Sequence, residues 1–137
     1  AGIAALELIA KGDVCSKATA TADSIRAQLT AVFEEEQVPW ACYGEHSGFF
    51  VFTNPANEAI TPSTFDPFEQ AHETLKLSGP GDLITKLRLG IMVNGVDMSA
   101  KPGGVVSAIH TPDDVDKTAN AMRQAVRMLK EEGDIAG

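Results

Sequence analysis

Apolar residues recur every three or four positions along much of the chain, the spacing that gathers them on one face of a helix. Residues 1–10 show this spacing at Ile3, Leu6 and Ile9. After a break at residues 11–13, a longer helix is predicted for residues 16–36. Its apolar face consists of Ala18, Ala22, Ile25, Leu29, Val32 and Phe33.

The strongest helix signal lies near the end of the sequence. Thr111 is a natural N-cap, and Pro112 suits the first helical position. The carboxylates of Asp113 and Asp114 favour the positive end of the helix dipole. Gly133 is expected to stop the helix. Its buried positions are Val115, Ala119, Met122, Val126 and Leu129.

Two further helices are predicted in the middle of the chain. A short one covers residues 66–77, with Asp66 as its cap. Another follows the break at residues 78–81, is capped by Asp82 and ends at residues 94–95. The buried stripe of this second helix consists of Leu83, Ile84, Leu87 and Ile91.

Short runs rich in β-branched and aromatic residues predict three strands, at residues 38–43, 48–53 and 105–109. In the second strand, Phe49 and Val51 would face one way and Phe50 and Phe52 the other, so both faces are expected to be covered. Trp40 is expected in the core or at a subunit contact. Together the elements predict an α+β fold, with a small, mainly antiparallel sheet packed under helices.

Composition narrows the class of protein. A chain of 137 residues that is 44% hydrophobic fits one domain. The formal charge of −8 argues against nucleic acid or anionic membrane as a partner, because both need a basic face. No apolar stretch approaches the roughly 18 residues of a spanning helix. Cys15 and Cys42 lack metal-ligand spacing, and we expect them to be free, reduced thiols in a cytoplasmic protein.

Candidate catalytic groups are sparse. His46, His72 and His110 lie in no recognisable nucleophile–base context, and their spacing does not suit zinc. His46 is expected to be exposed and His110 to be structural. The glycine turns at residues 79–81 and 102–104 lack the accompanying residues of a phosphate loop. No catalytic or metal-binding residue is assigned to this chain.

The run from Gly95 to Asp116 carries a family resemblance. From Val106 it reads Val-Ser-Ala-Ile-His-Thr-Pro-Asp-Asp-Val-Asp, after the helix exit at Gly95-Val96. This run resembles the C-terminal small domain of class III aminotransferases, which use pyridoxal phosphate (PLP), and most closely the glutamate-1-semialdehyde aminomutase group. The likeness spans essentially the whole chain, but its specific motif is confined to residues 95–118.

The resemblance implies a part of a fold-type I PLP enzyme that is a homodimer when whole. Residues 1–12 would end a helix that leads from a missing large PLP-binding domain, and residues 13–137 would form the C-terminal small domain. In the family, the Schiff-base lysine and the cofactor-binding groups lie before the segment that this chain resembles. No catalytic or cofactor-binding residue is therefore expected here, and the chain alone is expected to be inactive and to bind no PLP.

The same resemblance implies that the small domain closes over the substrate, an amino acid or an amine. Lys101, Gly103 and Gly104 would then be substrate-proximal, since their turn takes the place where the family approaches the active site. Some relatives are expected to hold a substrate carboxylate there with an arginine. Lys101 would offer a point charge without the bidentate fork. The substrate class stays open between a semialdehyde-like amino acid and a β-amino acid or other amine.

The alternative is an autonomous α+β binding or interaction domain without catalysis. Exposure of Ile3, Leu6 and Ile9 would favour the enzyme fragment, because it would mark a surface for a missing partner. Complete packing of residues 1–10 within the domain would favour the alternative.

Overall fold

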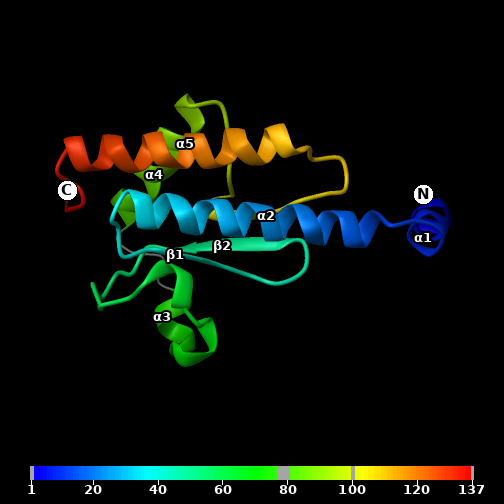
Figure 1. Ribbon diagram of the computed structural model, residues 1–137, viewed down its shortest axis with the longest axis horizontal. Helices are drawn as coiled ribbons and strands as arrows, with labels where there is room; N and C mark the ends of the chain where they lie inside the picture. Colours follow the sequence, from blue (N-terminus) through cyan, green and yellow to red (C-terminus); the bar gives the residue numbers. More distant parts are fainter. Residues whose placement is uncertain (1, 77–80, 100, 137) are drawn as a thin grey trace.

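The computed structural model describes residues 2–76, 81–99 and 101–136, and it confirms the α+β class. Strands β1 (Ala41–Tyr43), β2 (Gly48–Phe52) and β3 (Gly103–Val105) form one antiparallel sheet with β2 in the middle. Helix α2 (Val14–Glu35) lies along one face of this sheet (Figure 1). The sheet and the helices over it therefore form the layers that an α+β domain requires.

The other helices take different sides of the sheet (Figure 1). Helix α5 (Pro112–Glu131) packs against α2 and against α4 (Gly81–Val93). The short helix α3 (His72–Lys76) lies on the side of the sheet away from α5. Helix α1 (Gly2–Lys11) lies beyond the N-terminal end of α2. Among the helices of the described residues, none combines the length and the apolar character needed to cross a membrane.

The predicted apolar faces of the two long helices are confirmed. Every residue expected on the buried face of α2 is buried, and so is every residue expected on that of α5. The predicted cap is also present, since the Asp114 carboxylate accepts from the Thr111 N–H at 2.8 Å and the Thr111 hydroxyl accepts from the Asp114 N–H at 3.4 Å. Gly133 follows the helix end with a φ of 77°. Trp40 is buried and meets Phe33 edge-on, which places it in the core.

The predicted third strand was misplaced. Residues 105–109 were expected to pair, whereas β3 is Gly103–Val105 and the chain turns at the hydrogen bond from His110 N–H to Ser107 O. The pairing of β3 with β2 depends on the close approach of their backbones at Gly103, where a Cβ would lie 2.4 Å from the Phe49 carbonyl oxygen. Gly103 also has a φ of 146°, which favours glycine. The first strand is shorter than expected, since only residues 41–43 join the ladder.

The segment before α4 also differs from the prediction. Asp66 does cap a helical turn, because its Oδ1 accepts from the Phe68 N–H at 2.9 Å, but this turn is the 3₁₀ helix η2 (Pro67–Glu69). Gln70 is extended and separates η2 from α3, so the expected single helix is divided. Leu77, its expected end, lies outside the described residues.

Helix α4 begins at Gly81, so Asp82 lies inside it and is not its cap. Leu87 and Ile91 are buried as expected, whereas Leu83 and Ile84 are half-buried. Gly90 is the additional buried position, and a Cβ there would lie 2.9 Å from the Ala125 Cβ. The missing side chain thus lets α4 approach α5 closely.

Helix α1 buries none of its residues. Its apolar side chains Ile3, Leu6 and Ile9 are 77%, 67% and 51% exposed. The described residues therefore leave an apolar surface uncovered at this helix.

Candidate functional site

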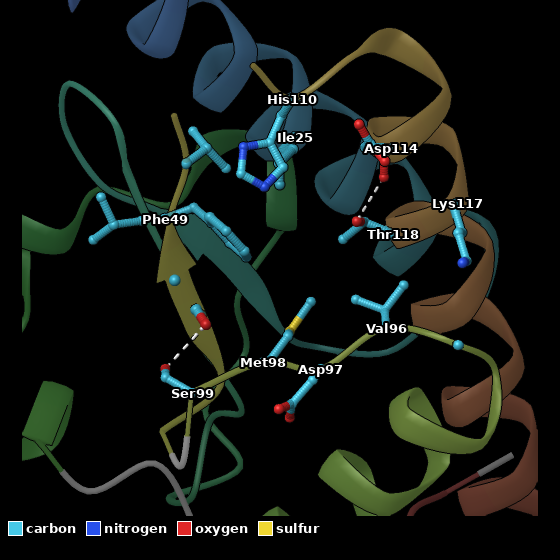
Figure 2. A pocket seen from close by; sticks show the side chains of 15 residues that line it. Ile25, Phe49, Val96, Asp97, Met98, Ser99, His110, Asp114, Lys117 and Thr118 are labelled. Carbon is cyan, nitrogen blue, oxygen red and sulfur yellow. Dashed lines mark hydrogen bonds between the residues drawn. The ribbon is translucent and has the colours of Figure 1, made fainter. Parts of the chain in front are cut away.

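A polar pocket of about 450 Å³ opens between β3, the segment after α4 and the start of α5 (Figure 2). Ile25 and Phe49 form part of its apolar wall. Gly103 and Gly104 both line it. Its polar lining consists of Asp97, Ser99, His110, Asp114, Lys117 and Thr118.

The carboxylate of Asp114 is committed to the cap of α5. Hydrogen bonds from the Thr111 N–H and hydroxyl, both 2.8 Å to Oδ2, hold the pKa of this carboxyl below its usual range. Thr118 donates its hydroxyl to the Asp114 carbonyl at 2.7 Å. The hydrogen bonds of both side chains therefore stabilise the start of α5.

His110 is held by a local turn. Its Nδ1 accepts from the Ser107 N–H at 3.0 Å, which leaves the ring proton of a neutral imidazole on Nε2. The Ser107 hydroxyl also lies 3.1 Å from Nδ1. The ring is exposed, and its contacts fit the structural role expected for it.

The remaining polar groups of the pocket form no nucleophile–base pair. The Ser99 hydroxyl donates to the carbonyls of Lys101 and Gly103, at 2.5 and 3.0 Å. Asp97 pairs with Arg88 at 3.2 Å. The geometry of these side chains suits binding of a polar group.

The structure separates the three residues expected near a substrate. Gly103 and Gly104 line the polar pocket, whereas Lys101 lines another pocket of about 250 Å³ with His72 and Lys76. Packing within the sheet also explains why both residues are glycines, since a Cβ on Gly104 would lie 3.3 Å from the Phe49 ring. Lys101 is exposed.

A larger apolar trough of about 840 Å³ lies beside β1 and β2, and α2 also contributes to its lining through Arg26, Ala27 and Thr30. Its aromatic lining comes from two parts of the chain that are distant in sequence, Tyr43 and Phe50 on one side and Phe65 and Phe68 on the other. Sequence reasoning missed this trough because it depends on the path of the irregular segment between β2 and α3. The strand alternation around Phe50 was the only signal that pointed to this face.

Cys42 forms part of the wall of the trough. Burial raises the pKa of its thiol to about 12, so the group is protonated at neutral pH. Burial also raises the pKa of Tyr43. Both cysteines are free thiols, as the sequence predicted.

The lysines of the chain lie at the surface of the described residues, where each is exposed or half-buried. Lys86 lies 2.7 Å from Asp134, whose hydrogen bond raises the pKa of the amine. Lys17 lies 3.0 Å from Asp13, and Lys130 donates to the Glu36 carbonyl. Within the described ranges, no cluster of three potential metal ligands occurs either.

Comparison with known proteins gives a fold likeness. No protein-family model matches the chain, and no curated protein sequence matches it. A solved structure of a transaminase with PLP bound aligns with 88% of this chain, with a TM-score of 0.65 and 17% identity. An omega-transaminase from Sphaerobacter thermophilus aligns with 80% of it, with a TM-score of 0.55 and 17% identity.

The chain spans 24% of the length of each of these transaminases. At this identity the likeness concerns the fold, and it does not single out the aminomutase group. The chain thus has the fold of one part of these two transaminases.

Proposed function

We propose that this chain is the C-terminal small domain of a PLP-dependent aminotransferase or 2,1-aminomutase, which acts on an amino acid or an amine. The observation that carries the proposal is the alignment of 88% of the chain with part of a PLP-bound transaminase. The sequence resemblance at residues 95–118 supports it independently, because it was drawn from residue identities and not from the path of the backbone.

The sequence motif supports the finer assignment to the aminomutase-like group. Its parts fall at structural boundaries, since Gly95 follows the end of α4 and Thr111 caps α5. A motif that coincides with a helix exit and a helix cap has a structural basis as well as a sequence likeness.

In this proposal the chain contributes to the substrate side of the active site. PLP, when bound by the larger domain, supplies an electron sink for the bond changes at the substrate carbon. The chain contributes the turn around Lys101, whose ammonium offers a point charge to a substrate carboxylate. Because Gly103 and Gly104 have no side chains, the backbone next to this turn can lie close to β2.

The exposed helix α1 supports the presence of a larger partner domain. Ile3, Leu6 and Ile9 present apolar area that a large domain or a second subunit would cover. An autonomous binding domain, the alternative, would be expected to pack these side chains within itself. The observation therefore favours the enzyme fragment.

The test is to express the full product of the gene that encodes this chain and, separately, residues 1–137. The full product is expected to bind PLP, and borohydride reduction followed by peptide mapping should place the label on a lysine outside these residues. Residues 1–137 alone should retain no stoichiometric label. Product analysis with amino donors and 2-oxo acids, and with a 1,2-amino aldehyde, would then separate transamination from amino migration.

Two outcomes would contradict the proposal. One is a full product that binds no PLP and moves no amino group. The other is a reduced label on a lysine within residues 1–137, because none of these lysines is buried.

A further inference from the structure

Three basic side chains meet beside the middle of the sheet. His72 and Lys76 of α3 and Lys101 line a pocket of about 250 Å³, together with Tyr43 and Phe50. The lining of this pocket contains no carboxylate. The chain has a formal charge of −8, so a cavity whose charged lining residues are all basic differs from the rest of the molecule.

The basic groups of this pocket are also unpaired among the described residues. Lys17, Lys86 and Arg127 each have a carboxylate within hydrogen-bonding distance. The ammonium groups of Lys76 and Lys101 make no ion pair or hydrogen bond with another described residue, since the Ser99 hydroxyl meets only the Lys101 carbonyl. Their positive charge is therefore available to a bound anion.

The basic pocket and the apolar trough are neighbours. Tyr43, Phe50 and Leu75 line both, so the two cavities share part of their walls. Phe50 is 42% exposed and Phe68 is 86% exposed, which leaves aromatic area open in the trough. The trough and the basic pocket, about 840 and 250 Å³, together have the size of a small-molecule site.

The charges around the trough give a ligand one orientation. Arg26, which lines the trough, is already engaged by the carbonyls of His46 and Gly48 and by Asp23. Glu45 adds a negative charge to the trough lining. An anionic group would therefore avoid Glu45 and settle at Lys76 and Lys101.

We propose that the trough and the basic pocket together bind a small organic anion, a carboxylate with an aromatic or aliphatic body. The carboxylate would lie between Lys76 and Lys101, and the apolar body would lie against Phe50 and Phe68. This site shares Lys101 with the substrate contact proposed above, but binding at it requires neither PLP nor catalysis, so it can be measured on residues 1–137 alone.

The first experiment compares three probes of the same shape by isothermal titration calorimetry in low salt. They are 4-phenylbutyrate, 4-phenyl-1-butanol and 4-phenylbutylamine. The anion should bind about three- to tenfold more tightly than the alcohol, since two exposed charge contacts are involved. The amine should bind most weakly. Equal affinities for the three probes, or no binding of any, would overturn the proposal.

Variants then locate the binding site. Lys76→Met with Lys101→Met should lower the affinity for the anion to that for the alcohol and leave the alcohol unchanged. Lys11→Met with Lys17→Met removes the same charge away from the pocket and should change neither. Phe68→Ser, at an exposed position, should weaken all three probes alike. If the two double variants behave identically, the basic pocket is not the site.

A protein occupant gives a different result. Sedimentation velocity over a range of concentrations would reveal self-association through the trough, which Phe68→Ser would abolish. Such self-association, with no discrimination among the probes, would assign the trough to a second copy of the chain and would overturn the proposal.

Discussion

The two faces of the sheet are covered in different ways. On one face, α2 packs with α4 and α5 over Phe49 and Val51, and the side chains between them are buried. The other face meets an irregular segment that contains the 3₁₀ helices η1 (Pro62–Thr64) and η2, of which η1 contacts β1 and also α2. This segment covers Phe52 by stacking Phe65 at 5.2 Å but leaves Phe50 partly exposed.

The difference shows that one face of the sheet contributes to stability and the other leaves room for pockets. Regular amphipathic helices fit together closely enough to exclude water along their whole length, which gives stability. A segment of short turns can meet a sheet only at a few points, and the spaces between those points become pockets. The expectation that both faces of β2 would be covered was therefore right for Phe52 and wrong for Phe50.

The strongest test of this contrast is to remove one large side chain from each face. Leu29→Ala, in the fully buried helical layer, should lower the free energy of unfolding by about 2–5 kcal/mol. Phe68→Ala, on the open face, should change it by less than about 0.5 kcal/mol. Urea denaturation followed by circular dichroism measures both. Similar losses would mean that the two faces are packed equally.

A smaller loss is expected where the sheet itself is tightest. Gly103→Ala should cost about 1–3 kcal/mol, because the new Cβ meets the Phe49 carbonyl at a φ that disfavours alanine. Gly2→Ala is the control, since its added Cβ would meet no atom within 4 Å outside its chain neighbours and the backbone of its own helix. The same denaturation experiment should show little change for the control. A harmless Gly103→Ala would mean that β3 is free to move away from β2.

The cap of α5 should give a smaller, pH-dependent effect. The pKa of Asp114 is lower in the folded protein than its ordinary value of 3.8, chiefly through the hydrogen bond from the Thr111 N–H. Its stabilisation is therefore present above pH 3.8 and is lost as the pH falls through the lower folded value. Asp114→Asn should destabilise the fold at pH 7, and the difference from the parent should narrow near pH 3.

Asp113→Asn is the control for the cap, because it removes the same charge from the same helix turn without removing the capping bond. Equal effects of the two substitutions would assign the stabilisation to the helix dipole and not to the hydrogen bonds of Asp114.

The last prediction concerns the reactivity of the two cysteine thiols and not the stability of the fold. At pH 8, iodoacetamide should modify exposed Cys15 at least about tenfold faster than Cys42, whose burial raises its pKa to about 12. Peptide mapping by mass spectrometry measures both rates, and urea should make them similar. Rapid labelling of Cys42 in the folded chain would show that the wall of the trough opens readily.

The sequence predicted the helical layer well because helical periodicity reports burial directly. Leu29 and Met122 were assigned to the core from spacing alone, and the cap at Thr111 followed from local chemistry. Strand propensity gave the wrong position for β3. It favoured the β-branched residues after Val105, whereas the residues that pair with β2 include two glycines, which can approach that strand more closely. The buried role of Gly90 was missed for the same reason, since a residue without a side chain gives no apolar signal.

The pockets were less predictable than the core. Gly103 and Gly104 were expected near a substrate, and they line the polar pocket, but their proximity to a substrate remains a prediction. Lys101 was considered alone because His72 and Lys76 join it only through the path of a segment with no periodic pattern. A site assembled from three distant segments leaves no spacing in the sequence to recognise.

Gly103 and Lys101 are two residues apart and under opposite constraints. At Gly103 any side chain would collide with β2, whereas the exposed Lys101 side chain meets no such barrier. Over the divergence of a lineage, substitutions would thus be removed by selection at the first position and tolerated at the second. The turn could then acquire a new charge, and with it a new ligand preference, in a single mutational step that leaves the sheet intact.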